Sequence, residues 1–147
     1  MKITQYKIYA VLSLVLIILL SFVFFFERKT TREIVINNKT ITAEVADTFP
    51  KRARGLMFRE YLGESEGMLF IFDNEDFHTF WMLNTKIPLD IIWINKEKKI
   101  VHIERDVKPC EESCPKYVPS EKALYVLEMN ANYTVENKIS LSDKVLF

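Results

Sequence analysis

Three charged side chains stand among apolar neighbours and could do chemistry. Asp90 lies inside the run Ile-Pro-Leu-Asp-Ile-Ile, Glu128 lies between Leu127 and Met129, and Arg54 belongs to a basic stretch. A buried carboxylate must be hydrogen-bonded or paired, or it takes up a proton. Three interpretations follow: a structural one, a ligand pocket in which Arg54 meets an anion and a carboxyl group orients a polar group, and acid–base catalysis by paired carboxylates, as in glycosidases.

The structural interpretation makes a specific prediction about Asp90. Either carboxylate could accept hydrogen bonds from backbone amides or from Arg52 and Arg54. No charge adjacent to Asp90 in the sequence can compensate it, and the nearest dense positive charge lies at 52–59. We therefore expect Asp90 and Arg54 to share one buried polar network that holds a basic helix on the sheet, because a buried charge needs a partner.

Further candidates for ligand contact lie along residues 77–83 and just beyond them. On a strand, His78 and Asn84 would share one face, and Trp81 would lie on the other. The simplest interpretation makes His78 a hydrogen-bonded rim residue and packs Trp81 and Trp93 in the core. The alternative is that the tryptophans line a sugar-binding surface. His78, Trp81 and Asn84 thus join Arg54, Asp90 and Glu128 as ligand-binding candidates.

The two cysteines, Cys110 and Cys114, favour a disulfide. They are an even pair at close spacing in a chain with an export-type N-terminus. Free thiols are the alternative. A zinc site would need two more ligands, and His78 and His102 do not have the spacing of one, so no metal is predicted. The sequence has no Gly-x-Ser-x-Gly motif and no glycine-rich phosphate loop. It therefore predicts no cofactor and leans away from an enzyme.

The elements that must position these residues are mostly strands. Asn37 and Asn38 tolerate the positive φ of a tight hairpin. A basic helix is expected from Asp47 or Thr48 to about Phe58, with Pro50 in its first turn. A single helical turn is expected at 134–138. The expected strands are 32–36, 40–46, 68–72, 77–83, 89–94, 99–104, 123–129 and 144–147. This pattern predicts a β-barrel or sandwich-like fold with one main short helix.

Residues 30–147 have the length of one domain with a real core. They carry 16 basic and 19 acidic residues, a net charge of −3. Nucleic-acid binding normally shows as clustered surplus positive charge, so it is not expected here.

The N-terminal part, residues 1–29, predicts a membrane anchor. Residues 8–26 contain no charge, glycine or proline. As a helix they would span about 28 Å, close to the thickness of a bilayer core. A signal peptide is the first alternative, but large aromatics occupy the place of a small-residue cleavage site. A buried helix of a soluble fold is the second. We expect an uncleaved single transmembrane helix with the lipid bilayer as partner.

The orientation of this anchor does not follow from flanking charge. Lys2 and Lys7 precede the span, and Arg28, Lys29 and Arg32 follow it, so the two sides nearly balance. Because a disulfide persists outside the cytosol, the cysteine pair favours a cytoplasmic N-terminus and an extracytoplasmic domain.

Long ordered motifs run through nearly the whole domain. They are Ala-Asp-Thr at 46–48, Arg-Ala-Arg-Gly-Leu-Met-Phe-Arg at 52–59, Gly-Met-Leu-Phe-Ile-Phe at 67–72, Phe-Trp-Met-Leu-Asn-Thr at 80–85, Ile-Pro-Leu-Asp-Ile-Ile at 87–92, the two cysteines, and Leu-Glu-Met at 127–129. In these motifs residues 33–147 resemble DUF192, a bacterial and archaeal family of unknown function. The resemblance implies a compact, mostly-β fold that is commonly exported, and it implies no reaction.

The sequence thus favours a membrane-tethered extracytoplasmic β-domain that binds a small or glycan-like ligand or a protein partner. The first alternative is an envelope hydrolase that uses Asp90 or Glu128. The second is a structural subunit of a membrane complex, which would show an exposed apolar patch.

Overall fold

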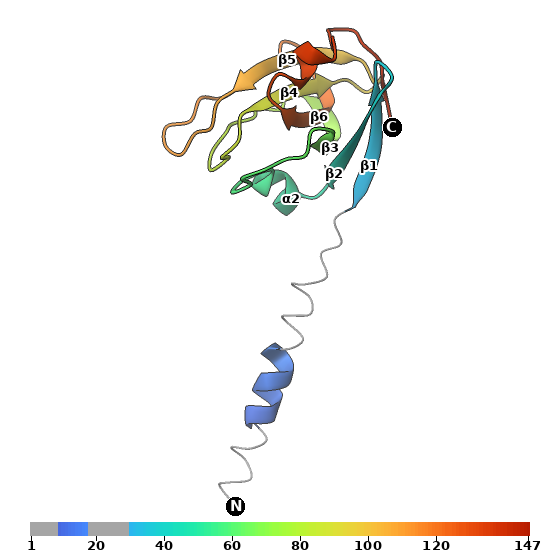
Figure 1. Ribbon diagram of the computed structural model, residues 1–147. Coiled ribbons are helices and arrows are strands. Elements are labelled where there is room, and N and C mark those ends of the chain that lie inside the picture. Colours follow the sequence, from blue (N-terminus) through green and yellow to red (C-terminus); the bar gives the residue numbers. More distant parts are fainter. Residues whose placement is uncertain (1–8, 18–29) are drawn as a thin grey trace, which may run out of the picture.

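The computed structural model describes residues 9–17 and 30–147, and Figure 1 shows it as a ribbon. Residues 9–17 are helical. Residues 8 and 18–26 of the predicted span, residues 8–26, lie outside the described residues, as does most of the 1–29 segment. Within the described ranges no helix combines the length and the apolar content needed to cross a bilayer.

The domain is mostly β, as the sequence predicted. Its elements are β1 (Thr31–Ile36), β2 (Lys39–Ala46), α2 (Phe49–Arg54), β3 (Glu66–Asp76), β4 (Leu89–Ile94), β5 (Ile100–Val107), β6 (Ala123–Asn130), α3 (Tyr133–Glu136) and β7 (Val145–Leu146). The strands form one sheet in the order β5-β4-β6-β3-β2-β1-β7. Its pairs are antiparallel except β2 with β3, which is parallel.

The sheet curls into a half-barrel, so the barrel expectation fits better than the sandwich (Figure 1). Residues 143–145, where β7 begins, also approach the opposite edge of the sheet. The amide of Ile100 donates to the Asp143 carbonyl at 3.0 Å, and the amide of Val145 donates to the Lys98 carbonyl at 2.8 Å. The C-terminal segment therefore bridges β1 and the start of β5 at one end of the half-barrel.

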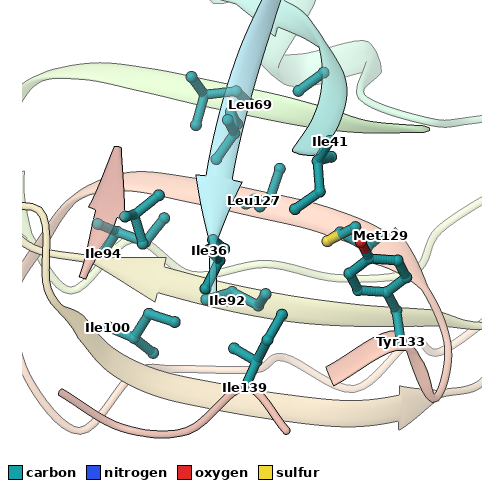
Figure 2. Close-up of a cluster of buried hydrophobic side chains, with 13 residues drawn as sticks. Ile36, Ile41, Leu69, Ile92, Ile94, Ile100, Leu127, Met129, Tyr133 and Ile139 are labelled. Carbon is teal, nitrogen blue, oxygen red and sulfur yellow. The ribbon is translucent and has the colours of Figure 1, made fainter. Parts of the chain in front are cut away.

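Each face of the sheet has its own hydrophobic cluster. The inner cluster includes Ile36, Ile92 and Leu127 and draws on all seven strands, as the close-up in Figure 2 illustrates. The outer cluster includes Phe70 and Trp93 and is covered by the chain around α2 and by the segment that follows β3. Both faces are buried, which explains why strands such as β4 are apolar at nearly every position.

Local signals explain where several elements begin and end. Asn37 and Asn38 have φ values of 49° and 63°, as the predicted hairpin between β1 and β2 requires. The α2 helix begins with Pro50 in its first turn but ends at Arg54 rather than Phe58, because Gly55 adopts a φ of 49°. The basic helix is therefore shorter than expected, and Arg59 lies outside it.

The prediction of a strand at 77–83 is wrong. This segment makes isolated bridges instead, from Phe80 to Tyr117 and from Leu83 to Cys110. Both sides of β4 are already paired, with β5 and with β6, so no place in the centre of the sheet remains for it. The segment lies over the outer cluster, where the side chains of Phe80 and Met82 pack.

Candidate functional site

The two buried carboxyl groups lie on opposite faces of the sheet. In the β4–β6 ladder Asp90 pairs with Met129, and Ile91 pairs with Glu128. Because side chains alternate along a strand, this register places Asp90 beside the inner cluster and Glu128 beside the outer one. The two groups do not face one cleft.

Asp90 is fully buried and saturated with hydrogen bonds. Its Oδ1 accepts from the amides of Asp106 at 2.9 Å and Asn132 at 3.1 Å. Its Oδ2 accepts from the Thr134 amide at 2.9 Å and the Thr134 hydroxyl at 2.6 Å. Asp90 thereby ties β5 and the first turn of α3 to β4. Its role is structural, as one interpretation held.

The predicted network between Asp90 and Arg54 is wrong. The hydrogen-bond partners of Asp90 in the described part of the chain all belong to β5 and the α3 region, and Arg54 lies on the outer side of the sheet at the end of α2. Backbone amides supply what the sequence suggested an arginine would supply. Such amides can satisfy a carboxylate fully, because each N–H donates a hydrogen bond to one of its oxygens.

Arg52, not Arg54, holds α2 on the sheet. Its guanidinium donates to the carbonyls of Asp47 and Ile71, both at 2.8 Å. It also lies 5.2 Å from the centre of the Phe72 ring and 4.0 Å from the Asp73 carboxylate. These contacts fix the helix against β3 and make it one wall of a pocket.

The pocket holds about 320 Å³ and has aromatic walls. We call it the aromatic pocket. It is lined by Phe49, Arg52, Ala53, Arg54, Gly55, Leu56, Met57, Phe70, Phe72, Thr79, Phe80, Trp81, Leu83, Thr85 and Glu128. Gly55 matters to its shape, because its positive φ turns the chain back over Phe70, where an added Cβ would come within 3.3 Å of the ring.

Glu128 is the buried polar group of the aromatic pocket. Its side chain is 4% exposed, and its carboxyl group has no hydrogen bond or ion pair with another described residue. No fully enclosed side-chain polar atom of the described residues lacks a partner, so the oxygens of this carboxyl group open onto the pocket. Burial raises the pKa of Glu128 to about 8. At neutral pH the group is therefore mostly a neutral acid, which can donate an O–H hydrogen bond to an acceptor in the pocket.

Arg54 and Trp81 complete the polar and aromatic lining. Arg54 is exposed, and within the described ranges its guanidinium has no ion-pair or hydrogen-bond partner. Trp81 is 48% exposed, so the expectation of core packing is wrong for it. That expectation is correct for Trp93, which is fully buried and donates from Nε1 to the His78 carbonyl at 2.8 Å.

His78 and Asn84 support the pocket without lining it. The His78 ring stacks on Phe72 at a centroid distance of 3.5 Å, and its Nε2 lies 3.0 Å from the Asn74 carbonyl. Asn84 has a φ of 56°, and its carbonyl accepts from the Phe58 amide at 2.7 Å. Both residues therefore shape the segment that carries Trp81.

Cys110 and Cys114 form the predicted disulfide. The Cys110 carbonyl accepts from the Asn84 amide at 2.9 Å, and Tyr117 exchanges two backbone hydrogen bonds with Phe80. The disulfide loop thus braces the wall that carries Trp81 and Leu83. No group of three or more acidic, histidine or cysteine side chains suited to a metal occurs among the described residues.

Known protein families and proteins include clear relatives of this chain. The model of DUF192, described as an uncharacterized ACR, matches residues 31–147. The chain belongs to the DUF192 family. A UPF0127 protein of Pyrococcus abyssi is 32% identical over 107 residues, which is 69% of this chain and 82% of that protein. A UPF0127 protein of Thermococcus gammatolerans is 33% identical over 90 residues, 58% of this chain and 52% of that protein.

Two crystal structures are similar to this DUF192 domain. A Sinorhizobium meliloti protein described as a candidate transcription regulator has a TM-score of 0.73 and 28% identity, over 80% of this chain and 94% of that one. A Novosphingobium aromaticivorans protein of unknown function has a TM-score of 0.73 and 32% identity, over 83% of this chain and 89% of that one. The family resemblance seen in the sequence is confirmed, and it brings no assigned reaction.

The sequence identified three residues of the aromatic pocket, Arg54, Glu128 and Trp81, and misplaced Asp90 with them. It missed the apolar walls, such as Phe49 and Phe80, because an isolated phenylalanine carries no signal of what it will face. Gly55 was the available hint, since a glycine directly after a short basic helix marks a sharp turn of the chain.

Proposed function

We propose that this domain is a binding module whose ligand occupies the aromatic pocket. The observation that carries the proposal is the carboxyl group of Glu128, buried in that pocket without a partner among the described residues. Burial leaves this carboxyl group with little contact with water, and a ligand in the pocket that accepts its hydrogen bond would stabilise it.

The lining indicates the chemistry of the ligand. The aromatic walls fit an apolar or planar body, neutral Glu128 fits a hydrogen-bond acceptor such as a carbonyl oxygen, and Arg54 at the rim fits an anion. A volume of about 320 Å³ suits a small ligand or one part of a larger one.

We further propose that the module is tethered to a membrane through residues 8–26 and lies outside the cytoplasm. The uncharged apolar run and the disulfide support this placement. Labelling of a cysteine introduced at exposed Lys39 with an impermeant reagent in intact cells tests it. Labelling only after lysis would contradict the extracytoplasmic placement.

The form of the hydrolase hypothesis that pairs Asp90 with Glu128 loses its geometric basis. Acid–base catalysis by Asp90 and Glu128 needs both groups at one substrate, and the β4–β6 register separates them onto two faces. Nucleic-acid binding is also not proposed. The net charge of residues 30–147 is −3, and two cations of α2 have protein partners: Lys51 pairs with Asp47 at 3.0 Å, and Arg52 binds backbone carbonyls.

A thermal-shift screen of the full chain in detergent tests ligand binding. Aromatic and short-chain carboxylates and phosphates are the first compounds to screen. A ligand that binds the native state raises the melting temperature. The shift should disappear in Glu128→Leu and shrink in Arg54→Gln, and it should persist in the control Lys39→Gln, which changes an exposed residue at the β1–β2 hairpin.

The pH dependence of binding gives a second test. Because the pKa of Glu128 is about 8, the affinity for a hydrogen-bond acceptor should fall as the pH rises through about 8. Glu128→Gln keeps a donor at every pH and should bind without this dependence. A shift that survives in Glu128→Leu would place the ligand elsewhere and refute the proposed site.

A further inference from the structure

Exposed aromatic side chains surround the mouth of the aromatic pocket. Phe49 is 77% exposed and Trp81 is 48% exposed, and both line the pocket. Phe58 is 60% exposed, and its amide donates to the carbonyl of Asn84, between two residues of the pocket wall. Large exposed aromatics grouped around one opening indicate a surface that meets an apolar partner.

This mouth lies at the end of the sheet where the chain enters the domain. The Val45 amide donates to the Thr30 carbonyl at 2.7 Å, and α2 begins three residues after β2 ends at Ala46. Figure 1 shows α2 near the start of β1, at the end of the domain away from the β1–β2 hairpin. The wall formed by α2 is therefore close to the point at which residue 30 enters the sheet.

The chain between the predicted span and β1 is short. Four residues, 27–30, separate Phe26 from Thr31. Even fully extended, that connection reaches at most about 18 Å. If residues 8–26 cross a bilayer, the end of the domain that carries α2 must lie close to the lipid headgroups.

The charges at this end of the domain favour contact with an anionic surface, but only weakly. Arg54 has no partner among described residues, whereas Lys51 is paired with Asp47 and Arg52 lies near Asp73. The sequence adds Arg28, Lys29 and Arg32 around the entry point, against Glu27 and Glu33. Tryptophan is favoured at the membrane interface, where its ring is partly wet and partly apolar.

We propose that the mouth of the aromatic pocket faces the bilayer and that the pocket takes part of an anionic phospholipid from it. This inference rests on the proposed function and names the class and source of the ligand. Arg54 would pair with the phosphate, the Glu128 acid would donate to an ester carbonyl, and the aromatic walls would contact the glycerol and first acyl carbons.

Tryptophan fluorescence of the full chain in vesicles tests the proposed orientation. The chain has two tryptophans, and Trp93 is fully buried while Trp81 stands at the mouth. Phospholipids brominated on the acyl chain should therefore quench Trp81 and spare Trp93. Quenching should disappear in Trp81→Phe. Equal quenching in wild type and Trp81→Phe, or none in either, would overturn the bilayer-facing mouth.

Lipid composition and Arg54 test the ligand class. Quenching by brominated phosphatidylglycerol should exceed that by brominated phosphatidylcholine at equal density. Competition by unbrominated phosphatidylglycerol should weaken about tenfold or more in Arg54→Gln, as expected for loss of a charge-assisted bond, and should be unchanged in Lys39→Gln. Quenching without preference for the anionic lipid, or unaffected by Arg54→Gln, would overturn the phospholipid assignment.

The two proposals can fail separately. If a water-soluble compound from the screen shifts the melting temperature through Glu128 while Trp81 is not quenched, the pocket binds a ligand that does not come from the bilayer. If Trp81 is quenched and a water-soluble glycerophosphate shifts the melting temperature as much as the whole lipid does, the headgroup alone is the ligand, and the acyl contacts proposed here are wrong.

Discussion

Asp90 and Glu128 are neighbours across one strand pair and have opposite surroundings. Asp90 pairs with Met129 and Glu128 with Ile91, so one register step separates them. Asp90 accepts four hydrogen bonds, and Glu128 accepts none from the described residues. Both are buried acids on central strands. The supply of donors, not the depth of burial, separates a structural carboxylate from one that is open to a ligand.

The largest effect should come from Asp90. Replacing it by Asn removes the charge from four hydrogen bonds and turns an amide NH₂ toward donors, so we expect a loss of about 3–5 kcal/mol in the free energy of unfolding. Chemical denaturation measures it. Thr134→Val, which removes one of the four bonds and the bond that the Thr134 hydroxyl accepts from Arg105, is the partial change and should cost less. An unchanged stability of Asp90→Asn would show that its amide partners are satisfied by water.

Glu128 should behave in the opposite way. Its pKa rises from 4.5 to about 8 on folding, so folding favours the neutral form of Glu128. The free energy of unfolding should therefore be highest below about pH 4.5 and should fall as the pH rises through about 8. Across this window the loss is about 1.4 kcal/mol per pH unit. Glu128→Gln should remove this dependence and be more stable than wild type at pH 7. Parallel pH profiles of the two proteins would refute a neutral Glu128.

The disulfide should have an intermediate effect on stability and a clear effect on the pocket. Its loop is short, so replacing Cys110 and Cys114 by Ser should cost about 1–3 kcal/mol in the free energy of unfolding. The Cys110 carbonyl accepts a hydrogen bond from the Asn84 amide, so a looser disulfide loop should also loosen the wall that carries Trp81. Ligand binding should weaken as a result. Denaturation and the thermal-shift titration measure the two effects. Intact-mass analysis of the native protein should find no free thiols.

The smallest effect on stability should come from Arg54. It is exposed and has no partner in the described part of the chain, so Arg54→Met should change the free energy of unfolding by less than about 0.5 kcal/mol. It should nevertheless weaken ligand binding. Combined with Asp90→Asn its effect should be additive. A large coupling energy between the two changes would instead support a network of Asp90 with Arg54, which the structure does not contain.

Local patterns predicted much of the fold. The hairpin at Asn37 and Asn38 and the strands β4 and β6 lie within a residue or two of their expected bounds, because short apolar runs and turn chemistry are local signals. The segment at 77–83 was mispredicted for the opposite reason. Its aromatic and apolar residues suit a strand, but the strand order decides whether a place in the sheet is available.

The sequence by itself determined the β-rich class, the family and the cysteine pair. It also singled out Asp90 and Glu128, because a charged residue within an apolar strand is rare. The tertiary structure decided which of these acids found donors and which faced the aromatic pocket. The physical reason is that a shift of one residue in strand register moves a side chain to the other face of a sheet. Register is set by pairing between residues far apart in the chain, here 90 with 129, and no local pattern contains it.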